Sequence, residues 1–130
     1  MKKAGVIFNP EKPKAKNELL KLKNWLNKRK CQVIAISSSQ KHCPNIDFAI
    51  TLGGDGTMLK ASRILAPLNI PVLGVNLGSL GFMAETNPKE VYGLLPDILA
   101  NKYRTEERMM LDVSIKTHQK SINLLAFFLL

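Results

Sequence analysis

The chain has only two cysteines, few aromatic residues and no long apolar run, and each shortage excludes a class of protein. Cys31 and Cys43 supply neither the spacing of a zinc site nor a disulfide framework, and we expect Cys31 to be a core thiol at the start of a strand. No apolar stretch approaches the roughly 20 residues that span a bilayer. Met1-Lys2-Lys3 is not followed by the long apolar segment of a secretory signal peptide. We therefore expect a cytoplasmic protein without a membrane partner.

Positive charge is concentrated in one part of the chain. The formal net charge is +9, and residues 1–30 hold ten Lys or Arg against two Glu. Within this part, residues 12–30 carry apolar side chains at helical spacing, among them Leu19, Leu22 and Leu26. This pattern is typical of a helix with a solvated basic face. We expect no nucleic-acid partner, because the excess charge belongs to this single helix.

Apolar, β-branched runs alternate with helical segments through the first hundred residues. The expected strands are residues 4–8, 32–36, 47–52 and 71–75, and the expected helices are residues 13–30, residues 57–66 and a segment that begins at Asn87. Such alternation predicts an α/β fold with a parallel, Rossmann-like sheet and helices on both faces. We assign residues 1–101 to this α/β domain.

The pattern changes after Lys102. Residues 108–116 partly alternate between apolar and polar side chains, which predicts a half-buried strand. We therefore assign residues 102–130 to the first strand or strands of an incomplete β-rich domain. The apolar end of the chain, from Asn123 onward, has two interpretations: it is a buried terminal strand, or it marks a chain cut short or read out of frame.

A glycine-rich motif, Gly53-Gly54-Asp55-Gly56-Thr57, stands between an expected strand and an expected helix. Glycines let backbone N–H groups approach a ligand and adopt conformations that other residues avoid. The start of the following helix favours negative charge. The motif therefore indicates phosphate handling, with Asp55 beside the phosphates, although a simple tight turn is the plainer alternative. It is neither a P-loop nor a dinucleotide fingerprint, because Leu59 takes the place of the third glycine.

A second loop, residues 76–81, follows the fourth expected strand. In an open parallel sheet, ligands bind outside the carboxyl ends of the strands. Both loops follow strands, so both are expected at that edge. We therefore predict that they form one site.

Together the two loops resemble motifs of a known family. Gly53 to Thr57 is similar to the motif shared by NAD kinases, diacylglycerol-type lipid kinases and 6-phosphofructokinases. The run Asn76-Leu77-Gly78-Ser79-Leu80-Gly81-Phe82 resembles the NxGxLGF motif of NAD kinases. The run Gly56-Thr57-Met58-Leu59-Lys60 also fits NAD kinases, whereas lipid kinases usually continue with an Asn-Glu pair after the Leu, where this chain has Lys60. The resemblance covers about residues 4–116 and implies a phosphofructokinase-like sheet.

The resemblance implies ATP-dependent phosphorylation of NAD at the 2′-hydroxyl of its adenosine ribose, with Asp55 as the catalytic base. It implies ATP, NAD and a divalent cation, Mg²⁺, as cofactors, and a homo-oligomer for a full-length protein. No residue of the chain is assigned as a metal ligand. The residues expected to bind the nucleotides are Gly53, Gly54, Gly56, Thr57, Lys60, Asn76 and Phe82. Lys60 has a plain helix-surface position as its alternative, and Phe82 a core position.

The chain also departs from the family pattern. Family members continue into a β-rich domain that carries an Asn-acidic pair and a Thr-Pro-Thr-Gly-Ser-Thr-like segment. Neither is present here, and Asn123 is followed by Leu124. We therefore expect a damaged site with little or no kinase activity. The alternatives are a non-catalytic nucleotide-binding fragment and a lipid kinase of the same superfamily.

Overall fold

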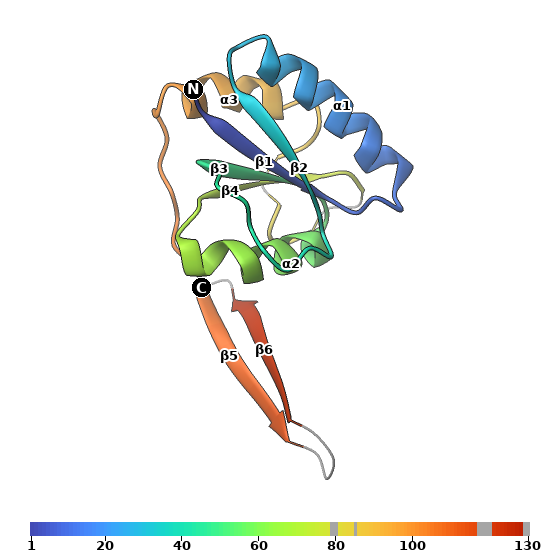
Figure 1. Ribbon diagram of the computed structural model, residues 1–130, viewed down its shortest axis with the longest axis vertical. Coiled ribbons are helices and arrows are strands. Elements are labelled where there is room, and N and C mark those ends of the chain that lie inside the picture. The colour runs from blue at the N-terminus through green and yellow to red at the C-terminus, as the bar shows by residue number, and fades with distance from the viewer. Residues whose placement is uncertain (79–80, 85, 117–120, 129–130) are drawn as a thin grey trace.

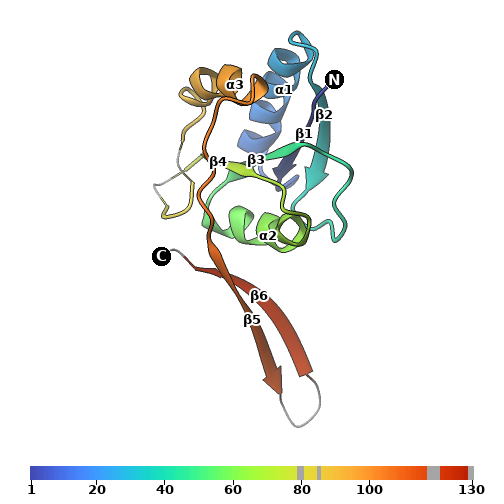
Figure 2. The same ribbon diagram turned by 90° about the vertical axis from the view of Figure 1, so that its left-hand side faces the viewer.

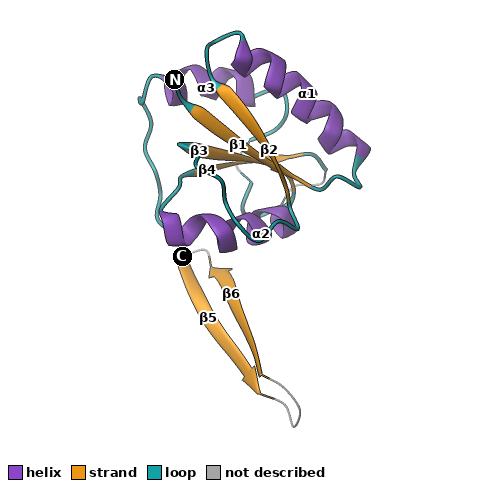
Figure 3. Cartoon of the chain, viewed as in Figure 1, coloured by secondary structure: helices purple, strands orange, loops and turns teal. Residues whose placement is uncertain are grey.

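The computed structural model describes residues 1–78, 81–84, 86–116 and 121–128 (Figure 1). Strands and helices alternate through the first hundred residues, and a hairpin follows (Figure 3). In chain order the elements are β1 (Lys3–Phe8), α1 (Pro13–Asn27), β2 (Gln32–Ser37), β3 (Phe48–Gly53), α2 (Asp55–Leu65), the 3₁₀ turn η1 (Ala66–Leu68), β4 (Val72–Asn76), α3 (Val91–Leu99), β5 (Met109–Lys116) and β6 (Ser121–Phe128).

Four of these strands form a parallel sheet in the order β2-β1-β3-β4. The register places Phe8 beside Leu52 and Gly53 beside Asn76, so these strands end together at one edge. The expected parallel α/β fold is confirmed. This edge receives both glycine-bearing motifs.

Helices cover both faces of the sheet, as expected. Helices α1 and α3 lie on one face and α2 on the other (Figures 1 and 2). Side chains that alternate along β1 serve the two faces, because successive strand residues point to opposite sides. Ala4 and Val6 pack in the cluster with Leu22 of α1 and Leu95 of α3, whereas Ile7 packs in the cluster with Leu65 of α2.

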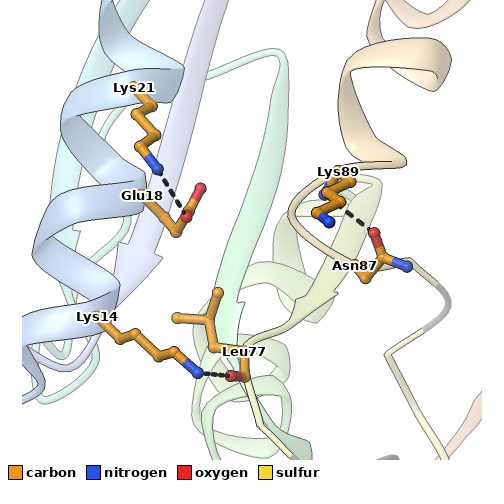
Figure 4. Close-up of polar contacts among 6 residues, drawn as sticks. All are labelled: Lys14, Glu18, Lys21, Leu77, Asn87 and Lys89. Atoms are coloured by element: carbon orange, nitrogen blue, oxygen red, sulfur yellow. Dashed lines mark hydrogen bonds and ion pairs between the residues drawn. The ribbon is translucent and has the colours of Figure 1, made fainter.

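Two helix ends differ in detail from the expectation. Helix α1 ends at Asn27, three residues early, because Lys30 adopts a left-handed conformation (φ 59°) and the N–H of Cys31 donates to the carbonyl of Leu26 at 3.0 Å. Cys31 is buried directly before β2, as predicted. The expected cap at Asn87 is present, since its Oδ1 accepts the N–H groups of Lys89 and Glu90 at 2.9 Å each (Figure 4). The regular helix α3 begins at Val91, three residues after the first helical position expected at Pro88.

Strands β5 and β6 form an antiparallel hairpin that projects from the α2 side of the sheet (Figure 2). The strand expected at 108–116 is confirmed, and the apolar end forms a strand at Ser121–Phe128, while its expected burial lies outside what the structure describes. The division into domains at residue 102 stays a prediction. Across the described ranges, none of the helices has the length and apolar character required to cross a membrane.

Candidate functional site

The first glycine motif is a helix start and not an open loop. Helix α2 begins at Asp55, two residues before the expected position, because Gly54 is extended (φ −128°, ψ −155°) and its carbonyl accepts the N–H of Met58 at 3.1 Å. Among the described residues, no side chain caps this helix start. The first N–H groups of a helix have no partner within the helix, and they carry its positive dipole end. The motif therefore presents a positive helix end at the carboxyl edge of the sheet.

The glycines of the motif are needed for space and not for an unusual backbone. None of the glycines in the described segments has a positive φ, so the expectation of conformations closed to other residues is wrong. A Cβ on Gly53 would lie 2.3 Å from Oγ1 and 2.8 Å from Cβ of Thr57. A Cβ on Gly54 or Gly56 would meet no atom of the described residues within 4 Å, apart from the adjoining chain. Gly53 therefore permits internal packing, while Gly54 and Gly56 leave room outside the protein.

The two motifs meet, as the strand order predicted. The N–H of Leu77 donates to the carbonyl of Gly53 at 3.0 Å. The carboxylate of Asp55 accepts the N–H of Phe82 at 3.1 Å on each oxygen, and its Oδ1 accepts the N–H of Met83 at 3.0 Å. The second motif therefore binds directly to the carboxylate of the first.

A cavity of about 330 Å³ lies between this edge and the start of α1. Its lining comprises Asn9, Lys12, Lys14, Ala15, Leu52, Gly53, Gly54, Thr57, Asn76, Leu77 and Gly78. The Nζ of Lys14 donates to the carbonyl of Leu77 at 3.1 Å, which joins α1 to the second motif (Figure 4). Cationic side chains and a helix start at the same cavity favour an anionic ligand.

Sequence reasoning missed Lys12 and Lys14, which it assigned to a solvated basic face. The sequence nevertheless contained an indication that these two lysines lie at the site. Residues 9–14 directly follow β1, so the rule that places ligands at the carboxyl ends of strands also applies to them. Because lysines occur along the whole helix, the sequence did not distinguish the two at its start, which line the cavity, from the others.

The remaining expected site residues occupy different positions. Asn76 is buried; its Oδ1 accepts the N–H of Gly78 at 3.1 Å and its own N–H donates to the carbonyl of Thr86 at 2.8 Å. Phe82 is 88% exposed, so its core alternative is wrong. Lys60 is exposed on α2, one turn beyond Gly56 and outside the cavity lining, which leaves both of its interpretations open. In the described part of the chain, no group of three or more His, Cys, Asp or Glu could hold a metal ion.

The chain is similar to known kinases in sequence and in fold. Residues 36–103 match the family model described as the ATP-NAD kinase N-terminal domain. The NAD kinase of Moorella thermoacetica is 37% identical over 134 residues, covering 94% of this chain and 43% of that protein. Yeast NADH kinase complexed with NADH has a TM-score of 0.71 at 17% identity, covering 98% of this chain and 46% of that one. An NAD kinase from Archaeoglobus fulgidus in complex with ATP has a TM-score of 0.58 at 24% identity, covering 83% and 40%.

The chain therefore spans less than half the length of these relatives. The family model nevertheless covers more than half of the chain, and it includes both glycine-bearing motifs. The resemblance drawn from those motifs is thus confirmed by an independent match. This chain belongs to the NAD kinase family, through its N-terminal domain.

Proposed function

We propose that the site serves the ATP-dependent phosphorylation of NAD at the 2′-hydroxyl of the adenosine ribose, which yields NADP. The observation that carries this proposal is the carboxylate of Asp55, held between the two motifs at the start of α2. A carboxylate in this position can accept a hydroxyl proton as phosphate is transferred. Phosphoryl transfer otherwise depends mainly on positioning and on neutralised charge.

The cavity beside Asp55 supplies the charge. Lys12 and Lys14 line it together with Gly54 and Thr57 at the start of α2. Because a Cβ on Gly54 or Gly56 would meet open space, phosphate oxygens can approach the N–H groups of the helix start. A divalent cation such as Mg²⁺ would bridge the ATP phosphates, and it would arrive with the nucleotide because Mg²⁺ sites commonly rely on substrate phosphates.

Phe82 and Lys60 extend the proposal to the acceptor. Phe82 is exposed while its backbone N–H binds the Asp55 carboxylate, so its ring offers an apolar surface for the nucleoside of NAD. The exposed ammonium of Lys60 lies on the Gly56 side of α2, where it can reach a phosphate of a ligand bound there. Two solved relatives support the ligand classes, since one is complexed with NADH and the other with ATP.

The test measures binding and turnover with the whole chain. Calorimetry with Mg²⁺-ATP and with NAD should show binding of both nucleotides, and an NADP-specific dehydrogenase should detect any product phosphorylated at the 2′ position. We expect Asp55→Asn to abolish whatever rate of turnover the chain has. The absence of binding for both nucleotides, or an unchanged rate in Asp55→Asn, would contradict the proposal.

A non-catalytic nucleotide-binding fragment is the second candidate. The observation that favours it is the cavity beside the start of α2, because its lysines and the helix start suit an anionic ligand whether or not phosphate is transferred. Tight Mg²⁺-dependent binding of ATP without turnover identifies this function. Robust NADP formation by the isolated chain excludes it. Diacylglycerol as acceptor separates both candidates from a lipid kinase.

A further inference from the structure

The carboxylate of Asp55 is held from one side by the backbone of the second motif. The N–H of Phe82 donates to both oxygens at 3.1 Å, and the N–H of Met83 donates to Oδ1 at 3.0 Å. Hydrogen bonds to an ionised carboxylate are among the stronger ones in proteins. The contact joins residues 27 and 28 positions apart, so it is a tertiary contact.

These bonds leave the two oxygens unequal. A carboxylate oxygen has two lone-pair sites. Oδ1 accepts two N–H groups, and Oδ2 accepts only the shared N–H of Phe82. One site therefore stays open on Oδ2 among the contacts of the described residues. Oδ2 is the oxygen that can accept a hydroxyl group of a ligand.

Gly81 lies against the same carboxylate, which occupies the space that a side chain at this position would need. A Cβ on Gly81 would lie 2.4 Å from Oδ1, 2.8 Å from Cγ and 3.0 Å from Oδ2 of Asp55. All three atoms belong to the carboxylate, so any side chain at Gly81 must displace it. No positive φ is found at the glycines of the described residues, so the contact with Asp55, and not a left-handed backbone, is what opposes alanine at Gly81.

We propose that Gly81 is a positioning residue, which together with the N–H groups of Phe82 and Met83 forms a seat that turns Oδ2 of Asp55 toward the acceptor hydroxyl. This inference rests on the proposed function, because it gives the hydroxyl of NAD as the group that Oδ2 meets. The second motif then has a role in addition to ligand contact: it orients the base of the first motif.

The first test concerns the seat alone and uses the amide resonances of Phe82 and Met83 in the whole chain. Gly81→Ala should move both resonances in the same direction as Asp55→Ala, because each variant removes the carboxylate from the two N–H groups. The control is the same substitution at Gly93 on α3, where an added Cβ, unlike one on Gly81, meets none of the described atoms within 4 Å, and it should leave both resonances in place. Unmoved resonances in Asp55→Ala would overturn the seat even if Gly81→Ala failed to fold.

The second test concerns orientation and compares NAD with its analogue lacking the 2′-hydroxyl on the adenosine ribose. The wild-type chain should prefer NAD by about tenfold, the size of one hydrogen bond to a charged group. Gly81→Ala should reduce this preference to near one while it binds the deoxy analogue as the wild type does. Gly93→Ala should keep the preference. A merely structural role of Gly81 would weaken both ligands equally, and that result would overturn the inference.

The two tests separate the inference from the proposed function. If the wild-type chain binds neither NAD nor ATP, the proposed function fails, and the amide resonances still decide whether the seat exists. If NAD binds with the tenfold preference and Gly81→Ala retains it, the proposed function stands and the positioning role of Gly81 is refuted.

Discussion

Alanine substitutions at two glycines of the first motif should have opposite effects on stability. In Gly53→Ala the new Cβ would lie 2.3 Å from Oγ1 and 2.8 Å from Cβ of Thr57. Rotation of the Thr57 side chain about χ1 moves Oγ1 but not Cβ, so the backbone of β3 or α2 must shift. In Gly56→Ala the new Cβ meets no atom within 4 Å, at a position inside the first turn of α2.

The magnitudes follow from these contacts. Overpacking of this kind costs about 1–3 kcal/mol of the free energy of unfolding. Alanine in place of a helical glycine adds about 0.5–1 kcal/mol to the free energy of unfolding, which raises Tm by about 2–4 °C in a chain of this size. Gly56→Ala should also weaken ATP binding by about tenfold, because its methyl group enters the space left for phosphate. The more stable variant should thus be the weaker binder.

Urea unfolding followed by tryptophan fluorescence measures the free energy of unfolding directly. Trp25 is the single tryptophan of the chain; its ring lies 5.7 Å from that of Tyr92 on α3 and 3.6 Å from the Arg29 guanidinium carbon. Its environment therefore changes when α1 and α3 separate. Equal destabilisation by both substitutions, or a Gly56→Ala variant that binds ATP as the wild type does, would refute this account of the glycines.

Three further predictions concern the cavity, the core and pH. Lys14→Ala should weaken ATP binding by about tenfold, whereas Lys23→Ala, on an exposed part of α1, should have little effect by calorimetry. Leu95→Ala should lower the free energy of unfolding in urea by about 2–5 kcal/mol. Leu94→Ala should lower it much less, because Leu94 is 44% exposed. Burial raises the pKa of the Cys31 thiol above 9.0, so the contribution of this thiol to the free energy of unfolding is full below pH 9 and falls as the pH rises further. Cys31→Ala should remove this part of the decline in stability at high pH. An unchanged profile of stability against pH in the variant would contradict the prediction.

The sheet could be predicted from the sequence because each strand is a short apolar run between breaks. The observed strands lie within one residue of their expected positions, as β3 at Phe48–Gly53 illustrates. Their order was not predicted, because pairing depends on contacts between residues far apart. The prediction that both motifs lie at one edge did not need this order, since the carboxyl ends of parallel strands lie at the same edge of a sheet.

The site was predicted in outline and missed in its contacts. Glycine is a poor helix former, so the start of α2 was placed at Thr57, although Asp55 suits the positive end of a helix. The hydrogen bond from Lys14 to Leu77 joins residues 63 positions apart, so it could not be predicted from a local sequence pattern. The contact of Gly81 with the Asp55 carboxylate also depends on tertiary packing.

The most direct test of the central claim is a titration of the isotope-labelled chain with NAD, followed through its amide resonances. If both motifs form one nucleotide site, the resonances of Gly54 and Gly56 should move together with those of Gly78 and Gly81, and all should fit one dissociation constant. Movement confined to the basic residues of α1, or separate constants for the two motifs, would contradict the claim.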